Sequence, residues 1–209
     1  MKVQLLLLAK APVAGVVKTR LCPPATPAQA ATIAAAALAD TIDALSTKPW
    51  TRRMIVLDGQ YPVPAGWHVI PQRGHGLAQR LAHAYADTAL PDTASLLVGM
   101  DTPQLTTSLL VAAASTLDDG ADAVFGPAAD GGWWTLGLRD PSHAAALAEV
   151  PMSSPDTGAR TLAGLRRRGL AVAMLPTLRD VDTVADAHAV AAQCPGSRFA
   201  AAVRAHLPR

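Results

Sequence analysis

Three basic side chains that could hold phosphate lie close together near the start of the chain: Lys10, Lys18 and Arg20. They follow an apolar run that ends at Ala9 and predicts a buried strand, and Gly15 lies between them. Ligands of open α/β sheets bind beyond the carboxyl ends of the strands, and a glycine-bearing loop with basic side chains suits phosphate. We interpret the segment as a nucleotide phosphate-binding loop. The alternative is a solvated basic loop.

Asp101 is the most informative acidic residue. It follows the apolar segment 95–99, with only Met100 between them, and Pro103 disfavours a helical backbone at Thr102. If this segment is a strand beside the first one, its carboxylate enters the same crevice as the basic loop. A carboxylate close to phosphates is repelled unless a cation lies between them, and Mg²⁺ is commonly held in this way. The alternative is that Asp101 caps the following helix.

Two further acids, Asp180 and Asp182, lie near the end of the chain. They alternate across Val181, so in an extended segment both side chains face one side. A carboxylate here could complete a metal site with Asp101 or cap the last helix. We favour Asp182 as the metal ligand and Thr183 as the cap.

Asp130 lies in a glycine-rich turn, followed by Gly131, Gly132, Trp133 and Trp134. Glycine permits positive φ angles and a close approach of the backbone to a ligand. Because successive residues of a strand point to opposite faces, only one tryptophan can line a pocket while the other packs into the core. Half of the chain's four tryptophans lie here, which favours a ring-stacking or lid role. Core packing is the alternative for each of them.

A weaker signal lies in the segment 72–80. Gln72 could hydrogen-bond the edge of a base, because an amide offers both a donor and an acceptor, and Gly76 lies in the glycine-rich turn beside it. Arg73 and Arg80 could reach phosphate or an anionic acceptor. We assign Gln72 and Gly76 to the nucleotide.

The elements that position these residues alternate between strand and helix along the chain, which predicts an α/β fold with a largely parallel sheet. Thr26 and Pro27 suit the start of the first long helix, and Gly169 suits the end of a later one. We expect strands at 3–9, 53–58, 67–71, 95–99, 121–125, 133–138 and 170–175. We expect helices at 27–45, 77–90, 106–117, 156–168, 184–193 and 197–207.

Composition narrows the class of protein. The 209 residues are 50% hydrophobic, enough for a substantial core, and show no linker, so we expect one domain over 1–209. A net charge of +2 with scattered basic residues argues against nucleic-acid binding. Cys22 and Cys194 fit a reduced, cytoplasmic protein. We expect no membrane association, since no apolar segment approaches the roughly 20 residues of a membrane span.

Four motifs taken together resemble the nucleotide-diphospho-sugar transferase superfamily: AKAPVAGVVKTRL, GMDTPQL, GPAADGGWWTLGL and DVDT. The chain is most similar to an uncharacterised bacterial family related to 2-phospho-L-lactate guanylyltransferase and the molybdenum-cofactor guanylyltransferase. This resemblance implies the glycosyltransferase-A fold, a Rossmann-like three-layer α/β/α sandwich with a mostly parallel mixed sheet of about seven strands. The chain departs from the family at Trp133, where most members have tyrosine, and at 152–154.

The resemblance also implies roles for individual residues. The nucleotide would contact the first loop at Leu8, Ala9, Gly15, Lys18 and Arg20. From the residues themselves we add Lys10, Gln72 and Gly76 to the nucleotide site. The metal, Mg²⁺ or Mn²⁺, would be held by Asp101 and Asp182. The acceptor would contact the second glycine-rich turn: Asp130, Gly131, Gly132 and Trp133. Catalytic roles would fall to Lys18, Arg20, Asp101 and Asp130.

Two transfer reactions fit these residues. A nucleoside triphosphate carries roughly two more charges than the diphosphate of a nucleotide sugar, and three cations in one loop are better explained by the triphosphate. We therefore expect a metal-dependent nucleotidyltransferase that transfers a nucleoside monophosphate to a phosphorylated small-molecule acceptor. A glycosyltransferase that uses a nucleotide sugar is the alternative, and a non-catalytic nucleotide-binding module is a second one. The sequence leaves open whether the protein forms a homodimer.

Overall fold

The centre of the protein is a seven-stranded sheet in the computed structural model, which describes residues 1–47 and 50–208. The strands are β1 (Lys2–Lys10), β2 (Arg52–Asp58), β3 (His68–Pro71), β4 (Thr93–Gly99), β5 (Ala123–Pro127), β6 (Trp133–Leu138) and β7 (Val172–Met174). Their order across the sheet is β3-β2-β1-β4-β6-β5-β7. β6 is antiparallel to β4 and β5, and the other pairings are parallel. The sheet is therefore mixed but mostly parallel.

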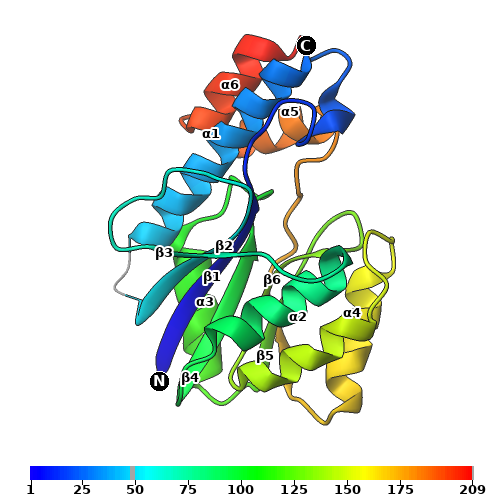
Figure 1. The fold of residues 1–209 in the computed structure, drawn as a ribbon. Coiled ribbons are helices and arrows are strands. Elements are labelled where there is room, and N and C mark those ends of the chain that lie inside the picture. Colours follow the sequence, from blue (N-terminus) through cyan, green and yellow to red (C-terminus); the bar gives the residue numbers. More distant parts are fainter. Residues whose placement is uncertain (48–49, 209) are drawn as a thin grey trace.

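Helices cover both faces of this sheet (Figure 1). They are α1 (Pro27–Ser46), α2 (Gly76–Thr88), α3 (Thr107–Asp118), α4 (Thr157–Arg167), α5 (Val184–Gln193) and α6 (Arg198–His206), with short 3₁₀ helices η1 (Thr19–Leu21) and η2 (Pro141–Glu149). One core cluster joins the sheet to α1 and α3, and a second joins its other face to α2, α4 and η2. The expected three-layer α/β/α architecture is confirmed.

β1 belongs to both layers of the core because its side chains alternate. Leu5 and Leu7 are fully buried in the cluster with α1 and α3, while Leu6 is fully buried in the cluster with α2. A parallel strand covered on both faces is apolar at nearly every position, which explains the continuous apolar run in the sequence. The run ends at Lys10, where the strand leaves the sheet.

The amino-terminal part of α1 extends past the sheet and packs against α5 and α6 (Figure 1). A third apolar cluster fills this contact, with Leu21, Ile33, Val181 and Phe199 all buried in it. The loop after β1 and the segment before α5 both contribute to this cluster. The two segments that carry the predicted basic and acidic residues are thus brought to one place.

The expected helix starts are confirmed at three positions. The hydroxyls of Thr26, Thr106 and Thr183 accept hydrogen bonds from the first turns of α1, α3 and α5. The 3₁₀ helix η2 was not predicted, because its short alanine-rich sequence lacks the 3.6-residue repeat of an amphipathic helix. No helix within the described residues is long and apolar enough to cross a membrane.

Candidate functional site

A cavity of about 580 Å³ opens where the carboxyl ends of β1 and β4 lie next to each other. The chain continues from β1 to β2 and β3 on one side, and β4 lies on the other side of β1. Such a reversal leaves a crevice outside the strand ends, which is where α/β sheets bind ligands. The basic loop follows the end of β1 and Asp101 follows the end of β4, so both lie at this edge of the sheet, as the sequence predicts.

Basic groups lie on the α2 side of the cavity. Lys10 and Arg80 both line it, and both pair with Asp58, at 3.8 Å and 2.8 Å between nitrogen and oxygen. Arg80 also donates to Oε1 of Gln72 at 3.3 Å. One carboxylate therefore partly neutralises two cations, so this side keeps a positive charge.

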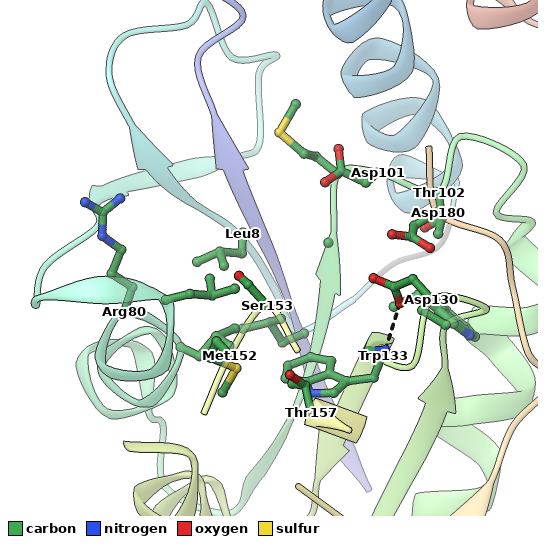
Figure 2. Close-up of a pocket in the computed structure, with 18 of the residues that line it drawn as sticks. Leu8, Arg80, Asp101, Thr102, Asp130, Trp133, Met152, Ser153, Thr157 and Asp180 are labelled. Atoms are coloured by element: carbon green, nitrogen blue, oxygen red, sulfur yellow. Dashed lines mark hydrogen bonds between the residues drawn. The ribbon is translucent and has the colours of Figure 1, made fainter. Parts of the chain in front are cut away.

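Acidic groups lie on the opposite side, as Figure 2 shows for Asp130 and Asp180 relative to Arg80. Asp130, Asp180 and Asp182 each offer a carboxylate oxygen, and these oxygens all lie within 4.8 Å of one another. Burial and the neighbouring charge of Asp130, with smaller contributions from Asp182 and Asp101, raise the pKa of Asp180 to about 6. We call these three residues the acidic triad.

Thr102 lies beside the acidic triad and is 1% exposed. Among the described residues, its buried hydroxyl oxygen has no hydrogen-bond partner, although it lines the cavity. A backbone hydrogen bond from Val181 to Asp101, at 2.9 Å, holds the two segments side by side. An unpaired hydroxyl is costly to bury in a core.

Lys18 and Arg20 lie in an adjoining pocket of about 270 Å³, which shares Lys10, Asp101 and Asp182 with the main cavity. The Lys18 ammonium lies 2.6 Å from Oδ1 of Asp101 and 3.8 Å from Oδ1 of Asp182, and it donates to the carbonyl of Val181. Arg20 contacts Oδ2 of Asp182 at 2.7 Å. Both cations thus pair with the acids that the sequence assigns to the metal.

The structure brings most of the predicted site residues to the main cavity. Those that line it are Leu8, Ala9, Lys10, Gln72, Gly76, Asp101, Asp130, Gly132, Trp133 and Asp182. Gly15 and Gly131 line neither pocket. Gly131 has φ +91°, and a Cβ there would lie 1.9 Å from the backbone oxygen of Pro155, so close packing against the segment before α4 explains this glycine.

The two tryptophan rings belong to opposite faces of the sheet, as strand alternation predicts, although both residues border the cavity; Asp130 lies in the turn before them. Oδ1 of Asp130 accepts from the Gly132 amide at 2.7 Å, which fixes the direction of the carboxylate. Trp133 lines the cavity and packs against Phe125, with ring centroids 6.4 Å apart. Trp134 is 2% exposed, and its indole nitrogen donates to the carbonyl of Pro176.

Gln72 is held by the protein itself. Its amide nitrogen donates to the carbonyls of Ala9, at 2.8 Å, and Val56, at 3.1 Å. Both amide hydrogens are therefore used, and the side chain ties the end of β1 to β2. Because the Gln72 amide is hydrogen-bonded within the protein, it has little capacity left to hydrogen-bond the edge of a base.

Three members of the site, Arg80, Asp180 and Thr102, were not among the residues assigned from the sequence. Arg80 was considered only as a group that could reach phosphate. Asp180 was weighed as one of an alternating pair, and only Asp182 was chosen. Apart from its position after Asp101, no feature of the sequence predicts that Thr102 belongs to the site. The alternation across Val181 was the usable signal for Asp180, because the structure places both acids on the cavity and buries Val181 at 1% exposure on the other side.

The most informative structural match is a protein from Desulfovibrio desulfuricans G20 that is provisionally assigned as a nucleotide-diphospho-sugar transferase. Its TM-score is 0.84 at 26% identity, and the match covers 98% of this chain and 95% of that one. This match confirms the transferase interpretation at the level of enzyme class. A comparison with curated proteins found no match.

Two more distant matches show the fold alone. Rv0371c from Mycobacterium tuberculosis H37Rv, in complex with manganese, has a TM-score of 0.57 at 21% identity, covering 91% of this chain and 97% of that one. The 2-C-methyl-D-erythritol 4-phosphate cytidylyltransferase of Thermus thermophilus has a TM-score of 0.58 at 15% identity, covering 93% and 100%.

The assignment of the chain to a sequence family rests on a family model that matches residues 28–154, more than half of the chain. The matched segment runs from the first turn of α1 to the residues that line the cavity before α4, and it includes Asp101, Asp130 and Trp133. The chain belongs to the family described as uncharacterized proteins conserved in bacteria, DUF2064.

Proposed function

We propose that the protein is a metal-dependent nucleotidyltransferase that transfers a nucleoside monophosphate from a nucleoside triphosphate to a small-molecule acceptor. The observation that carries this proposal is the division of charge in one cavity. Lys10 and Arg80 lie on one side, and the acidic triad lies on the other. Phosphoryl chemistry needs both groups, because cations offset the phosphate charge and carboxylates hold a divalent cation.

The phosphates of the donor would lie against Lys10 and Arg80. Leu8 and Leu81 line the same side and offer an apolar surface to the base or ribose. As the acceptor attacks the α-phosphorus, negative charge builds on the departing pyrophosphate, and fixed cations stabilise it. The sequence favours a phosphorylated acceptor, which would bind on the opposite side of the cavity.

The acidic triad fits a divalent cation. Carboxylate oxygens are the ligands that Mg²⁺ and Mn²⁺ prefer, and those of Asp130, Asp180 and Asp182 all lie within 4.8 Å of one another. Such a cation, when bound, withdraws charge from the phosphate and makes the phosphorus more electrophilic. Asp101 could join the ligands only if the Lys18 ammonium, 2.6 Å from its Oδ1, moved away.

One observation favours glycosyl transfer as a second candidate. Lys18 and Arg20 are paired with Asp101 and Asp182, so the main cavity offers phosphate mainly Lys10 and Arg80. Two cations suit the diphosphate of a nucleotide sugar as well as they suit a triphosphate. The number of basic residues in the loop therefore separates the two reactions less sharply than the sequence implies.

The products of slow hydrolysis distinguish the two reactions, because water can replace the acceptor. The protein is incubated with Mn²⁺ and either the four nucleoside triphosphates or UDP- and GDP-sugars, and products are separated by anion exchange. Nucleotidyl transfer gives nucleoside monophosphate and pyrophosphate, whereas glycosyl transfer gives nucleoside diphosphate and free sugar. Formation of neither product set would contradict both candidates.

A pair of matched variants ties the reaction to the site. Asp180→Asn should lower product formation at least about a hundredfold, the usual scale for losing a group that stabilises transition-state charge. Asp119→Asn is the control, since Asp119 is exposed at the end of α3. Equal activity in the two variants would remove the acidic triad from the mechanism.

A further inference from the structure

The cavity is strongly asymmetric in its basic side chains. Lys10 and Arg80 lie beside β1 and α2, which is the side assigned to the donor. Another part of the cavity wall is formed by Asp130, Gly132, Trp133, Met152, Ser153, Ser154 and Thr157, and we call these residues the acceptor side. Among the described residues that line the acceptor side, none is a lysine, arginine or histidine. A phosphate monoester placed there would meet no protein cation.

Basic residues near the acceptor side are already paired. Arg160 forms an ion pair with Asp156 at 2.5 Å. Arg179, directly before the acidic triad's Asp180, points to Asp186 at 2.9 Å. Neither arginine lines the cavity. The charge available to an acceptor is therefore that of the carboxylates themselves.

The groups that the acceptor side does offer suit hydroxyls and apolar carbon. Trp133 presents part of its indole ring and Met152 its thioether, and Figure 2 shows both bordering the cavity. The hydroxyls of Ser154 and Thr157 are used within the turn, on Asp156 and the carbonyl of Pro151. The Ser153 hydroxyl has no partner within the described part of the chain, and Ser153 is exposed with φ 58°.

From this arrangement we infer that the acceptor is an uncharged polyhydroxylated molecule, a sugar or related polyol, whose hydroxyl is the nucleophile. An aromatic face packs against the C–H groups of such a molecule, while carboxylates and a free hydroxyl bond to its O–H groups. This inference rests on the proposed nucleotidyl transfer and replaces the phosphorylated acceptor that the sequence favours.

The reaction balances with this acceptor. The acceptor oxygen forms a bond to the α-phosphorus, the bond from that phosphorus to the bridging oxygen breaks, and pyrophosphate leaves with the electron pair. The hydroxyl proton is released to water in the cavity. A divalent cation held by the acidic triad would be surrounded by three carboxylates, whose combined negative charge exceeds its own positive charge.

The test compares sugars with their own phosphate esters. Glucose and glucose 1-phosphate, mannose and mannose 1-phosphate, and glycerol and glycerol 3-phosphate are titrated into the full chain with Mg²⁺ and a non-hydrolysable triphosphate. Binding is followed by tryptophan fluorescence and ligand-detected NMR. The unphosphorylated member of a pair should bind at least about fivefold more tightly, because like charges a few ångströms apart repel even when largely hydrated. Equal or tighter binding of the phosphate esters, or no binding by any pair, overturns the inference.

Two variants make the test independent of folding. Ser153→Arg places a cation on the acceptor side and should reverse the preference toward the phosphate ester. Ser142→Arg is the matched control: Ser142 is exposed on η2 and does not line the cavity, so the wild-type preference should remain. An unchanged preference in Ser153→Arg counts against the inference.

Failure of the inference is distinguishable from failure of the proposed function. The proposed function predicts that a triphosphate with Mn²⁺ gives pyrophosphate even with water as the acceptor. If pyrophosphate forms and phosphate esters bind best, only the acceptor class is wrong. If no pyrophosphate forms, the nucleotidyl reaction itself is wrong.

Discussion

Replacing Lys18 with methionine should strengthen divalent cation binding while weakening the fold. The Lys18 side chain is 8% exposed, and its ammonium contacts Asp101, Asp182 and the carbonyl of Val181. Methionine has a similar length and carries no charge. The change removes one of the two positive charges beside Asp182, the other being that of Arg20, and leaves the carboxylates of the acidic triad in place.

The size of the effect follows from the distance between the charges. The ammonium lies 3.8 Å from Oδ1 of Asp182, and two unit charges about 4 Å apart interact by about 1 kcal/mol in water and about 4 kcal/mol in a poorly hydrated site. The Asp182 side chain is 37% exposed, so we expect the lower part of this range. About 1–2 kcal/mol corresponds to about 5- to 30-fold tighter metal binding.

The free energy of unfolding should move in the opposite direction. Removing one partner of a fully buried ion pair costs about 3–5 kcal/mol, because the remaining charge stays buried. Asp101 is 45% exposed and can be hydrated, so we expect a loss of about 1–3 kcal/mol without metal. Lys18 also has φ 50°, a strained backbone angle that the methionine variant keeps.

Mn²⁺ titration calorimetry and urea denaturation measure both quantities. Lys2→Met is the matched control, since Lys2 is exposed at the opposite end of β1. It should change neither the metal affinity nor the stability by more than about 0.5 kcal/mol. Unchanged or weaker Mn²⁺ binding by Lys18→Met would refute the view that this ammonium offsets the charge of the metal ligands.

Two further changes test the supports of the site. Gly131→Ala should destabilise the protein by well over about 1 kcal/mol, since the added Cβ would lie 1.9 Å from a backbone oxygen. In Gly15→Ala the added Cβ meets no atom within 4 Å, so this variant should lose only about 1 kcal/mol through backbone strain. Equal losses of stability in thermal denaturation would contradict the packing argument. Asp186→Ala should cost about 1 kcal/mol by removing the capping contacts of α5. Burial opposes ionisation of Asp186, but hydrogen bonds from Thr183 and the ion pair with Arg179 lower its pKa. The stability that ionised Asp186 contributes is therefore present above about pH 4, the pKa of the unfolded state, and is lost as the pH falls through the lowered pKa of the folded state. Urea denaturation should show that the difference in stability between Asp186→Ala and wild type becomes smaller in acid.

Local patterns were sufficient to predict much of the fold. The apolar run of β1, the alternation of strands and helices and the threonine caps each depend on residues close together in the sequence. The opposite faces of Trp133 and Trp134, and the shared face of Asp180 and Asp182, follow from the two-residue repeat of extended chain. Such features need no knowledge of what packs against them.

The partners of individual site residues depend on contacts between distant segments, so local patterns could not predict them. Lys18 is 163 residues from the carbonyl that it contacts, and nothing in the basic loop indicates that acids would neutralise it. The amide of Gln72 looked free to read a base because its acceptors belong to β1 and β2. The unpaired hydroxyl of Thr102 became visible only with three-dimensional packing.

The position of Val181 links chemistry to the order of folding. Its side chain is buried with Leu21 and Phe199 in the cluster beneath α5 and α6, while Asp180 and Asp182 on either side of it face the cavity. Packing of Val181 between the first and last parts of the chain therefore fixes the direction in which Asp180 and Asp182 point, and contacts between such distant segments form slowly. The divalent cation binding that we propose should thus appear late in refolding and serve as a reporter of the fully folded state.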